Sequence, residues 1–128
     1  MIKKKILIAT GGTGGHIFPA LSLAKNFTNK NYDIRITTDI RGLKYLGDKN
    51  KFNFSKIPSS PLIKKNIFTL LRSVILICYS IIKSLFLLLI IRPNIVLGMG
   101  GYSSFPICVA AKILKIKFII YENNLVIG

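Results

Sequence analysis

Two glycine-rich turns, each between an apolar segment and a helix-forming segment, constrain the fold of this 128-residue chain most strongly. The first covers residues 11–16, GGTGGH, and follows the apolar run ILIA; the second covers residues 98–104, GMGGYSS, and follows NIVL. Strands that are apolar along their whole length are typical of a parallel sheet covered on both faces. The recurrence of strand, glycine turn and helix therefore predicts an α/β domain with a doubly wound, Rossmann-like parallel sheet.

The rest of the chain continues this alternation. We expect strands at 4–10, 32–37, 52–57, 94–98 and 117–121, and helices at 18–28, 41–47, 63–91 and 102–115. Pro19 is acceptable in the first turn of its helix, and Pro93 ends the long helix before it. The length suits one domain over residues 1–128.

The charge of the chain is strongly positive. Nineteen Lys and Arg residues face four acidic residues, giving a formal net charge of +15. Such a field attracts polyanions, which include nucleic acid, an anionic bilayer and phosphorylated ligands. No RNA- or DNA-binding motif is present, and a chain rich in Lys, Ile and Asn is typical of an AT-rich genome. We therefore do not expect nucleic acid as a partner.

The chain offers few residues for metal or disulfide chemistry. Its two cysteines are Cys78 and Cys108, and its one histidine is His16. No Cys/His pair has the spacing of metal ligands, so we expect neither a metal nor a cofactor. Both cysteines lie in apolar runs, which predicts two buried, reduced thiols.

Each glycine turn is suited to holding a phosphate, because glycines allow close backbone approach and the N–H groups of a helix start attract anions. The first turn does not fit the dinucleotide fingerprint, since the third glycine would fall at Ile17, and no Gly-Lys-Ser/Thr of a P-loop follows. Two such loops on one sheet can cradle a diphosphate between them. The alternative for either loop is a tight turn without a ligand.

Three motifs occur in the order found in one enzyme family: TGGTGGHIFPAL at 10–21, LGMGGYSSFP at 97–106 and IIYENN at 119–124. Through them the whole chain resembles the N-terminal domain of glycosyltransferase family 28. In that family, bacterial cell-wall transferases add N-acetylglucosamine (GlcNAc) to undecaprenyl-pyrophosphoryl-MurNAc-pentapeptide. Residues 38–93 match in pattern rather than in motif. The third motif departs from the family's His-Glu-Gln-Asn at Tyr121 and Asn123.

The resemblance implies the N-terminal half of a GT-B glycosyltransferase, which has two Rossmann-like domains. The N-terminal domain would bind the lipid-linked acceptor and the C-terminal domain most of the UDP-GlcNAc. The complete enzyme would transfer GlcNAc to the C4 hydroxyl of MurNAc with inversion, for peptidoglycan synthesis on the cytoplasmic face of the cell membrane. Residues 1–128 would then be a truncated acceptor-binding domain without its donor domain, and we expect this chain alone to be inactive.

The resemblance also implies roles for individual residues. The positions that match the family's contacts to the UDP-sugar donor are Thr13, Gly14, Gly15 and Asn124. The positions that match its acceptor-diphosphate loops are Gly12, Gly100, Gly101 and Tyr102.

His16 matches a family histidine at the cleft, and its own position agrees with a catalytic role. An imidazole at a helix N-terminus tends to stay neutral and can accept the proton of the attacking hydroxyl. The alternative is a histidine that pins the loop. Glu122 is the rival base, because it follows the last expected strand, although it can equally serve as a structural hydrogen-bond acceptor.

The long helix over 63–91 is apolar almost all round. Its longest uncharged run, Ser73–Ile82, has ten residues, whereas a membrane span needs about 20. At 100° per residue, Lys65, Arg72 and Lys83 fall within about 40° of one another. One basic stripe on an apolar helix predicts contact with the surface of an anionic membrane. The alternatives are a helix buried against the sheet and a transmembrane helix that tolerates Lys83.

Two other functions stay open. The chain can be a non-catalytic membrane-anchor and acceptor-binding subunit of a split glycosyltransferase, whose donor site lies on a separate chain. Its length and long apolar helix suit that alternative, whereas the loop motifs favour the transferase domain. A free-standing nucleotide-binding domain is disfavoured, because no dinucleotide fingerprint is present and no acidic residue follows the second strand at the ribose position.

Overall fold

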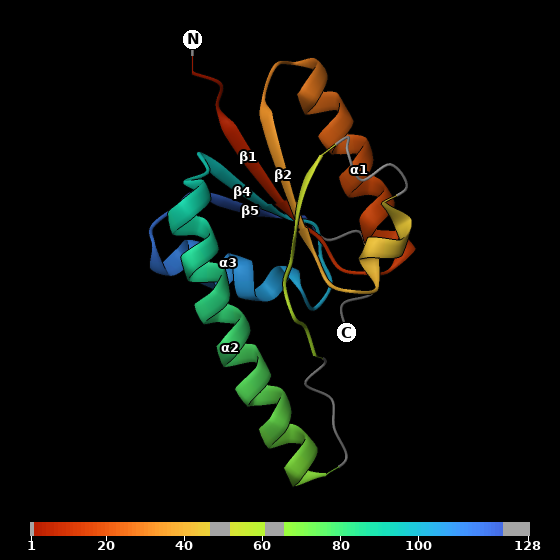
Figure 1. The fold of residues 1–128 in the computed structure, drawn as a ribbon, viewed down its shortest axis with the longest axis vertical. Helices are drawn as coiled ribbons and strands as arrows, with labels where there is room; N and C mark the ends of the chain where they lie inside the picture. Colours follow the sequence, from red (N-terminus) through yellow and green to blue (C-terminus); the bar gives the residue numbers. More distant parts are fainter. Residues whose placement is uncertain (1, 47–51, 61–65, 122–128) are drawn as a thin grey trace.

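The computed structural model shows a five-stranded parallel sheet with helices on both faces (Figure 1). It describes residues 2–46, 52–60 and 66–121. The strands, in the spatial order β3-β2-β1-β4-β5, are all paired in parallel. Their bounds along the chain are β1 Lys5–Ala9, β2 Asp33–Thr38, β3 Asn53–Lys56, β4 Ile95–Gly98 and β5 Phe118–Ile120. The helices are α1 Gly14–Asn29, the short 3-10 helix Gly42–Tyr45, α2 Ile67–Ile91 and α3 Ser104–Ile113.

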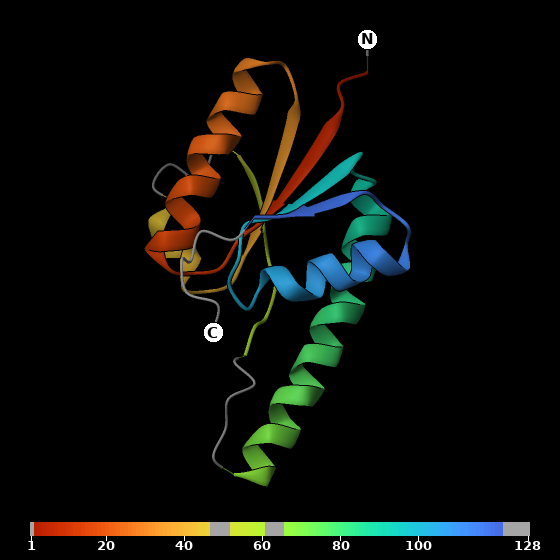
Figure 2. The same cartoon turned by 180° about the vertical axis from the view of Figure 1, so that it is seen from behind.

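The strand order explains why both faces are covered. The chain steps outward in one direction from β1 to β2 and in the opposite direction from β4 to β5. Because such crossovers are right-handed, α1 packs on one face of the sheet and α3 on the other. α2 joins α3 on its face, as the two opposed views show (Figures 1 and 2). The predicted doubly wound α/β fold is confirmed.

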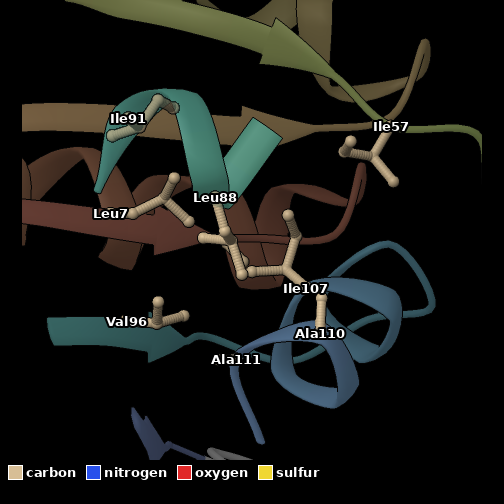
Figure 3. Packing of buried hydrophobic residues seen from close by; sticks show 9 residues of the cluster. Leu7, Ile57, Leu88, Ile91, Val96, Ile107, Ala110 and Ala111 are labelled. Atoms are coloured by element: carbon tan, nitrogen blue, oxygen red, sulfur yellow. The ribbon is translucent and has the colours of Figure 1, made fainter. Parts of the chain in front are cut away.

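Alternate side chains of β1 pack into two separate hydrophobic cores, one on each face of the sheet. Leu7 and Ala9 belong to one buried cluster with side chains of α2 and α3. Figure 3 shows Leu7 of this cluster beside Leu88 of α2 and Ile107 of α3. The intervening side chains pack against α1 on the other face. β1 is therefore buried on both sides, which accounts for its unbroken apolar sequence.

α1 begins four residues earlier than predicted. Thr13 is its N-cap in an extended conformation, and the carbonyl of Thr13 accepts hydrogen bonds from the backbone N–H of His16 at 3.1 Å and of Ile17 at 3.0 Å. The second half of the first glycine turn is therefore the first turn of a helix. Pro19 lies beyond that turn, so its expected first-turn position was wrong. His16 is at the helix start, as predicted.

α2 carries its serine side chains inward. The side chains of Ser73, Ser80 and Ser84 are buried, and Ser80 Oγ donates to the carbonyl of Pro58 at 2.6 Å. Large apolar side chains are exposed on the opposite side: Ile67, Phe68, Leu71, Ile75, Tyr79, Ile82, Phe86 and Ile90. Small residues at a helix interface with apolar residues outside are typical of membrane-associated helices.

Cys78 also lies on the exposed side of α2, so the prediction that it is buried was wrong. The serines occupy the face that packs on the domain, and this leaves the cysteine on the other. Cys108 of α3 is buried, as predicted, and burial raises the pKa of its thiol.

The 25 residues of α2 are long and apolar enough to cross a membrane by length and composition, and an 18-residue window of the helix has a mean hydropathy of 2.7. Its C-terminal end is nevertheless part of the domain, because Leu88 and Ile91 are buried in the core. The N-terminal half projects past the carboxyl ends of the strands (Figure 1). That half is about 20 Å long at 1.5 Å per residue, shorter than the roughly 30 Å of a bilayer's hydrocarbon core.

Candidate functional site

Both glycine loops lie where the winding of the sheet reverses. The first follows β1 and the second follows β4, and these two strands are neighbours in the centre of the sheet. Parallel α/β sheets bind ligands outside the carboxyl ends of their strands at such a reversal, because the helices that follow leave to opposite faces. The structure thus brings together two segments that are almost 90 residues apart in sequence.

The two loops are in direct contact. The backbone N–H of Gly11 donates to the carbonyl of Gly100 at 2.8 Å. Gly100 and Gly101 have φ angles of 92° and 85°, a region that favours glycine. A Cβ on Gly101 would lie only 2.5 Å from the Cα of Gly11. Glycine is therefore required for the second loop to approach the first this closely.

His16 packs against this junction. A Cβ on Gly100 would lie 2.8 Å from His16 Nδ1, so the imidazole ring covers the backbone of the second loop. Nδ1 is buried, and no described residue forms a hydrogen bond with it. The side chain itself is only partly buried. The predicted base thus stands on α1 yet touches the loop that precedes α3.

Sequence reasoning missed an ion pair beside the first loop, between the buried Asp39 and the partly exposed Arg41. The carboxylate of Asp39, at the carboxyl end of β2, accepts hydrogen bonds from the backbone N–H of Arg41 at 3.0 Å and of Gly42 at 3.2 Å. It also accepts from Arg41 Nε at 3.2 Å, Arg41 Nη2 at 2.7 Å and Ser59 Oγ at 2.9 Å. Its sequence signal was the acidic residue that directly follows β2, so the statement that no acidic residue follows the second strand was wrong.

Asp39 stays ionised although it is buried. Burial alone raises the pKa of this carboxyl, but the hydrogen bonds from Arg41, Ser59 and Gly42, with the charge of Arg41, outweigh burial and lower the pKa below 3.8. The same contacts raise the pKa of Arg41. A fixed cation therefore stands next to the glycine loops.

The remaining predicted residues occupy varied positions. Thr13, Gly15 and Tyr102 are exposed around the two loops, and Gly12 is buried against Asp39 and Arg41. The backbone N–H of Tyr121 donates to the carbonyl of Gly98 at 2.7 Å, which places the end of the described chain beside the second loop. Three predicted residues lie outside the described part of the chain: Lys65, Glu122 and Asn124.

The basic stripe of α2 is only partly exposed. Arg72 is exposed on the projecting half of the helix, and Lys83 is half-buried nearer the domain. Across residues 2–46, 52–60 and 66–121, no three His, Cys, Asp or Glu side chains are grouped so that they could hold a metal ion.

Comparison with known proteins gives consistent family matches. The model of the glycosyltransferase family 28 N-terminal domain matches residues 6–128. Among curated proteins, the chain is similar to UDP-N-acetylglucosamine--N-acetylmuramyl-(pentapeptide) pyrophosphoryl-undecaprenol N-acetylglucosamine transferases. It is 37% identical to that of Pelagibacter ubique and 38% identical to that of Protochlamydia amoebophila, over 99% of this chain in each case. These alignments cover 35% and 34% of the two relatives, so the chain spans about a third of their length.

Solved structures share the fold. A crystal structure of MurG from Acinetobacter baumannii superposes with a TM-score of 0.79 at 24% identity, covering 98% of this chain and 37% of that one. A glycosyltransferase from Rickettsia africae gives a TM-score of 0.67 at 19% identity, covering 94% of this chain and 30% of the other. This likeness confirms the Rossmann-like fold expected for the N-terminal half of a GT-B glycosyltransferase.

Proposed function

Because the chain belongs to glycosyltransferase family 28 through its N-terminal domain, we propose that it is the acceptor-binding domain of a lipid-linked GlcNAc transferase. The complete enzyme transfers GlcNAc from UDP-GlcNAc to the C4 hydroxyl of MurNAc in undecaprenyl-pyrophosphoryl-MurNAc-pentapeptide, for peptidoglycan synthesis. In this proposal the domain holds the acceptor, and a donor domain or a separate donor subunit supplies most of the nucleotide-sugar site.

The observation that carries the proposal is the contact between the two glycine loops. The hydrogen bond from Gly11 to Gly100 makes them one platform at the carboxyl edge of the sheet. The backbone N–H groups of such a platform, with the helix starts of α1 and α3, attract a diphosphate. We assign the acceptor diphosphate to the loop residues Gly12, Gly100, Gly101 and Tyr102.

His16 is the proposed general base. Its ring lies against Gly100, so an acceptor whose diphosphate rests on the second loop has its first sugar close to the imidazole. The base removes the proton of the attacking hydroxyl as the UDP leaving group departs from the anomeric carbon. Glu122 stays the rival base. The donor contacts in this proposal are Thr13, Gly14, Gly15 and Asn124.

The proposed place of action is the cytoplasmic face of the cell membrane. The exposed apolar side of α2 projects from the same edge of the domain as the glycine loops (Figure 2). With Arg72 and Lys83 facing anionic headgroups, α2 would hold the loops near the level where a lipid-linked diphosphate emerges. Because its C-terminal end is buried in the core, α2 is proposed to lie in the membrane surface rather than to span it.

A fusion enzyme tests the proposed function. Residues 1–128 replace the matching third of the Pelagibacter ubique relative, and transfer of labelled GlcNAc from UDP-GlcNAc to the lipid-linked acceptor is measured. We expect transfer, as with the relative itself. A fusion that folds and binds UDP-GlcNAc but transfers no GlcNAc would reject the transferase domain. If that fusion still bound acceptor-containing membranes, we would instead propose that the chain is a non-catalytic membrane-anchor subunit, a function that the exposed apolar face of α2 also suits.

A further inference from the structure

The guanidinium of Arg41 is held by Asp39 along one of its edges only. Nε and Nη2 both donate to Asp39 Oδ2, at 3.2 and 2.7 Å. A planar guanidinium has five N–H donors, so a second pair of donors, from Nη1 and Nη2, points away from Asp39. The side chain is 49% exposed, whereas that of Asp39 is 4% exposed. The arrangement presents a fixed, two-donor fork to solvent.

This fork is next to the platform of the glycine loops. A Cβ on Gly12 would collide with Asp39 Oδ1 and lie 2.7 Å from Arg41 Cβ, so the first loop packs directly on the ion pair. Tyr102 of the second loop is close enough to act electrostatically on Arg41. Arg41 therefore borders both loops, although it belongs to neither.

A second cation faces the same space. Arg41 and Lys56, the last residue of β3, line one open pocket of about 460 Å³ with Ile40, Pro58 and Ser59. With Asp39 counted, the three charged groups of this pocket sum to +1. The backbone N–H groups of the loops carry no net charge, whereas a diphosphate carries at least two negative charges. The pocket supplies a counter-charge that the loops lack.

We propose that Arg41, positioned by Asp39 and assisted by Lys56, binds a phosphate of the lipid-linked acceptor through its free pair of N–H donors. Bidentate Arg–phosphate pairs are stronger and more directional than contacts to neutral donors. This inference rests on the proposed function, because it deepens the description of the acceptor site. In this arrangement Asp39 is a positioning residue, and Arg41 is the residue that touches the ligand.

Titration of nanodiscs tests the inference with the 128-residue chain itself. Nanodiscs with undecaprenyl pyrophosphate are compared with nanodiscs of equal charge containing undecaprenyl monophosphate, and free inorganic pyrophosphate is titrated separately. The variants are Arg41→Gln, Lys56→Gln and Asp39→Asn. The matched control is Lys25→Gln, because it removes the same charge as Arg41→Gln. Lys25 is exposed near the C-terminal end of α1, away from the glycine loops. Circular dichroism and thermal midpoints check folding.

We expect Arg41→Gln to weaken binding of the pyrophosphate nanodiscs about tenfold or more, and Lys56→Gln to weaken it less. Lys25→Gln should stay close to wild type. Asp39→Asn adds one net positive charge, so simple charge attraction would strengthen binding, whereas loss of the positioned fork weakens it. Weaker binding of the pyrophosphate nanodiscs by Asp39→Asn therefore supports a role of Asp39 in positioning the guanidinium of Arg41.

The inference is overturned if Arg41→Gln binds the pyrophosphate nanodiscs as tightly as Lys25→Gln does. It is also overturned if Arg41→Gln weakens the binding of free inorganic pyrophosphate but not the binding of the pyrophosphate nanodiscs, because the ligand of Arg41 would then be soluble rather than lipid-linked. A wild-type chain that does not prefer the pyrophosphate nanodiscs would instead reject acceptor binding, and with it the proposed function. The two failures are therefore distinguishable.

Discussion

The hydroxyl of Ser103, buried at the start of α3, donates to the carbonyl of Thr10 at 2.7 Å. Thr10 directly follows β1, and this hydrogen bond joins positions that are 93 residues apart. Together with the contact between Gly11 and Gly100, it fixes the start of α3 to the carboxyl end of β1. The glycine loops are consequently a rigid part of the sheet edge, which suits a site that must orient an acceptor.

Gly101→Ala should destabilise the domain by about 1–3 kcal/mol, because its φ of 85° strains any other residue and the new Cβ would lie 2.5 Å from Gly11 Cα. Gly15→Ala is the matched control. Its Cβ meets nothing within 4 Å, and alanine is favoured inside a helix, so we expect no loss and up to about 1 kcal/mol of gain. Urea unfolding of both variants measures the difference. Equal free energies of unfolding would show that the close approach of the loops is not required.

His16→Ala should lower the turnover of the fusion enzyme at least tenfold with the fold intact, because general-base catalysis commonly contributes a hundredfold or more. His16→Gln separates the chemistry from packing, since the amide fills part of the same space but is not a base. Both variants should lose turnover to a similar extent while acceptor binding changes little. Unchanged turnover in His16→Ala would remove this residue from the chemistry and favour Glu122.

The expected fold could be predicted because its signals are local. Unbroken apolar runs such as 6–9, followed closely by glycines and then by a helix-forming segment, indicate the buried strands of a parallel sheet. The start of α1 was missed because Gly14 and Gly15 have low helix propensity, while Thr13 provides the N-cap. The local sequence pattern therefore predicts the order of the strands and helices better than it predicts their first and last residues.

The ion pair of Asp39 and Arg41 could not be predicted in the same way. The position of the pair beside Gly12 depends on β2 lying next to β1 in the sheet. The ionised state of Asp39 also depends on the hydrogen bond from Ser59, which is 20 residues further along the chain. The sequence also does not predict which face of α2 is exposed. An almost wholly apolar helix does not reveal which side packs inward, and here the buried side is the one with the serines.

Acid should remove the stability that Asp39 contributes. Its pKa is lower in the folded chain than the ordinary 3.8, so its contribution is fully present above that value and is lost as pH falls through the lowered folded pKa. The free energy of unfolding of Asp39→Asn should lie below that of wild type at pH 7, and the difference should shrink below about pH 4. Thermal unfolding from pH 7 to pH 2.5 measures this. A difference that is constant with pH would contradict the account.

The two cysteines report membrane contact without any mutation. Cys78 is exposed on the apolar side of α2, and Cys108 is buried with a raised pKa. A maleimide should label Cys78 in solution and leave Cys108 unlabelled until the chain unfolds. Vesicles containing anionic phosphatidylglycerol should slow the labelling of Cys78 severalfold, and neutral phosphatidylcholine vesicles should slow it less. Labelling that is insensitive to both kinds of vesicle would place this face of α2 away from the membrane.

The central claim is that the joined glycine loops hold the acceptor diphosphate. Photo-crosslinking tests it most directly, with an undecaprenyl-pyrophosphoryl-MurNAc-pentapeptide that carries a diazirine on its sugar, incorporated in nanodiscs and bound to the chain. Mass spectrometry of the cross-linked peptides should place the adducts within 11–16 and 98–105, and an excess of unlabelled acceptor should abolish them. Adducts confined to α2, or unaffected by the competitor, would show that the chain meets the lipid without holding its diphosphate on the loops.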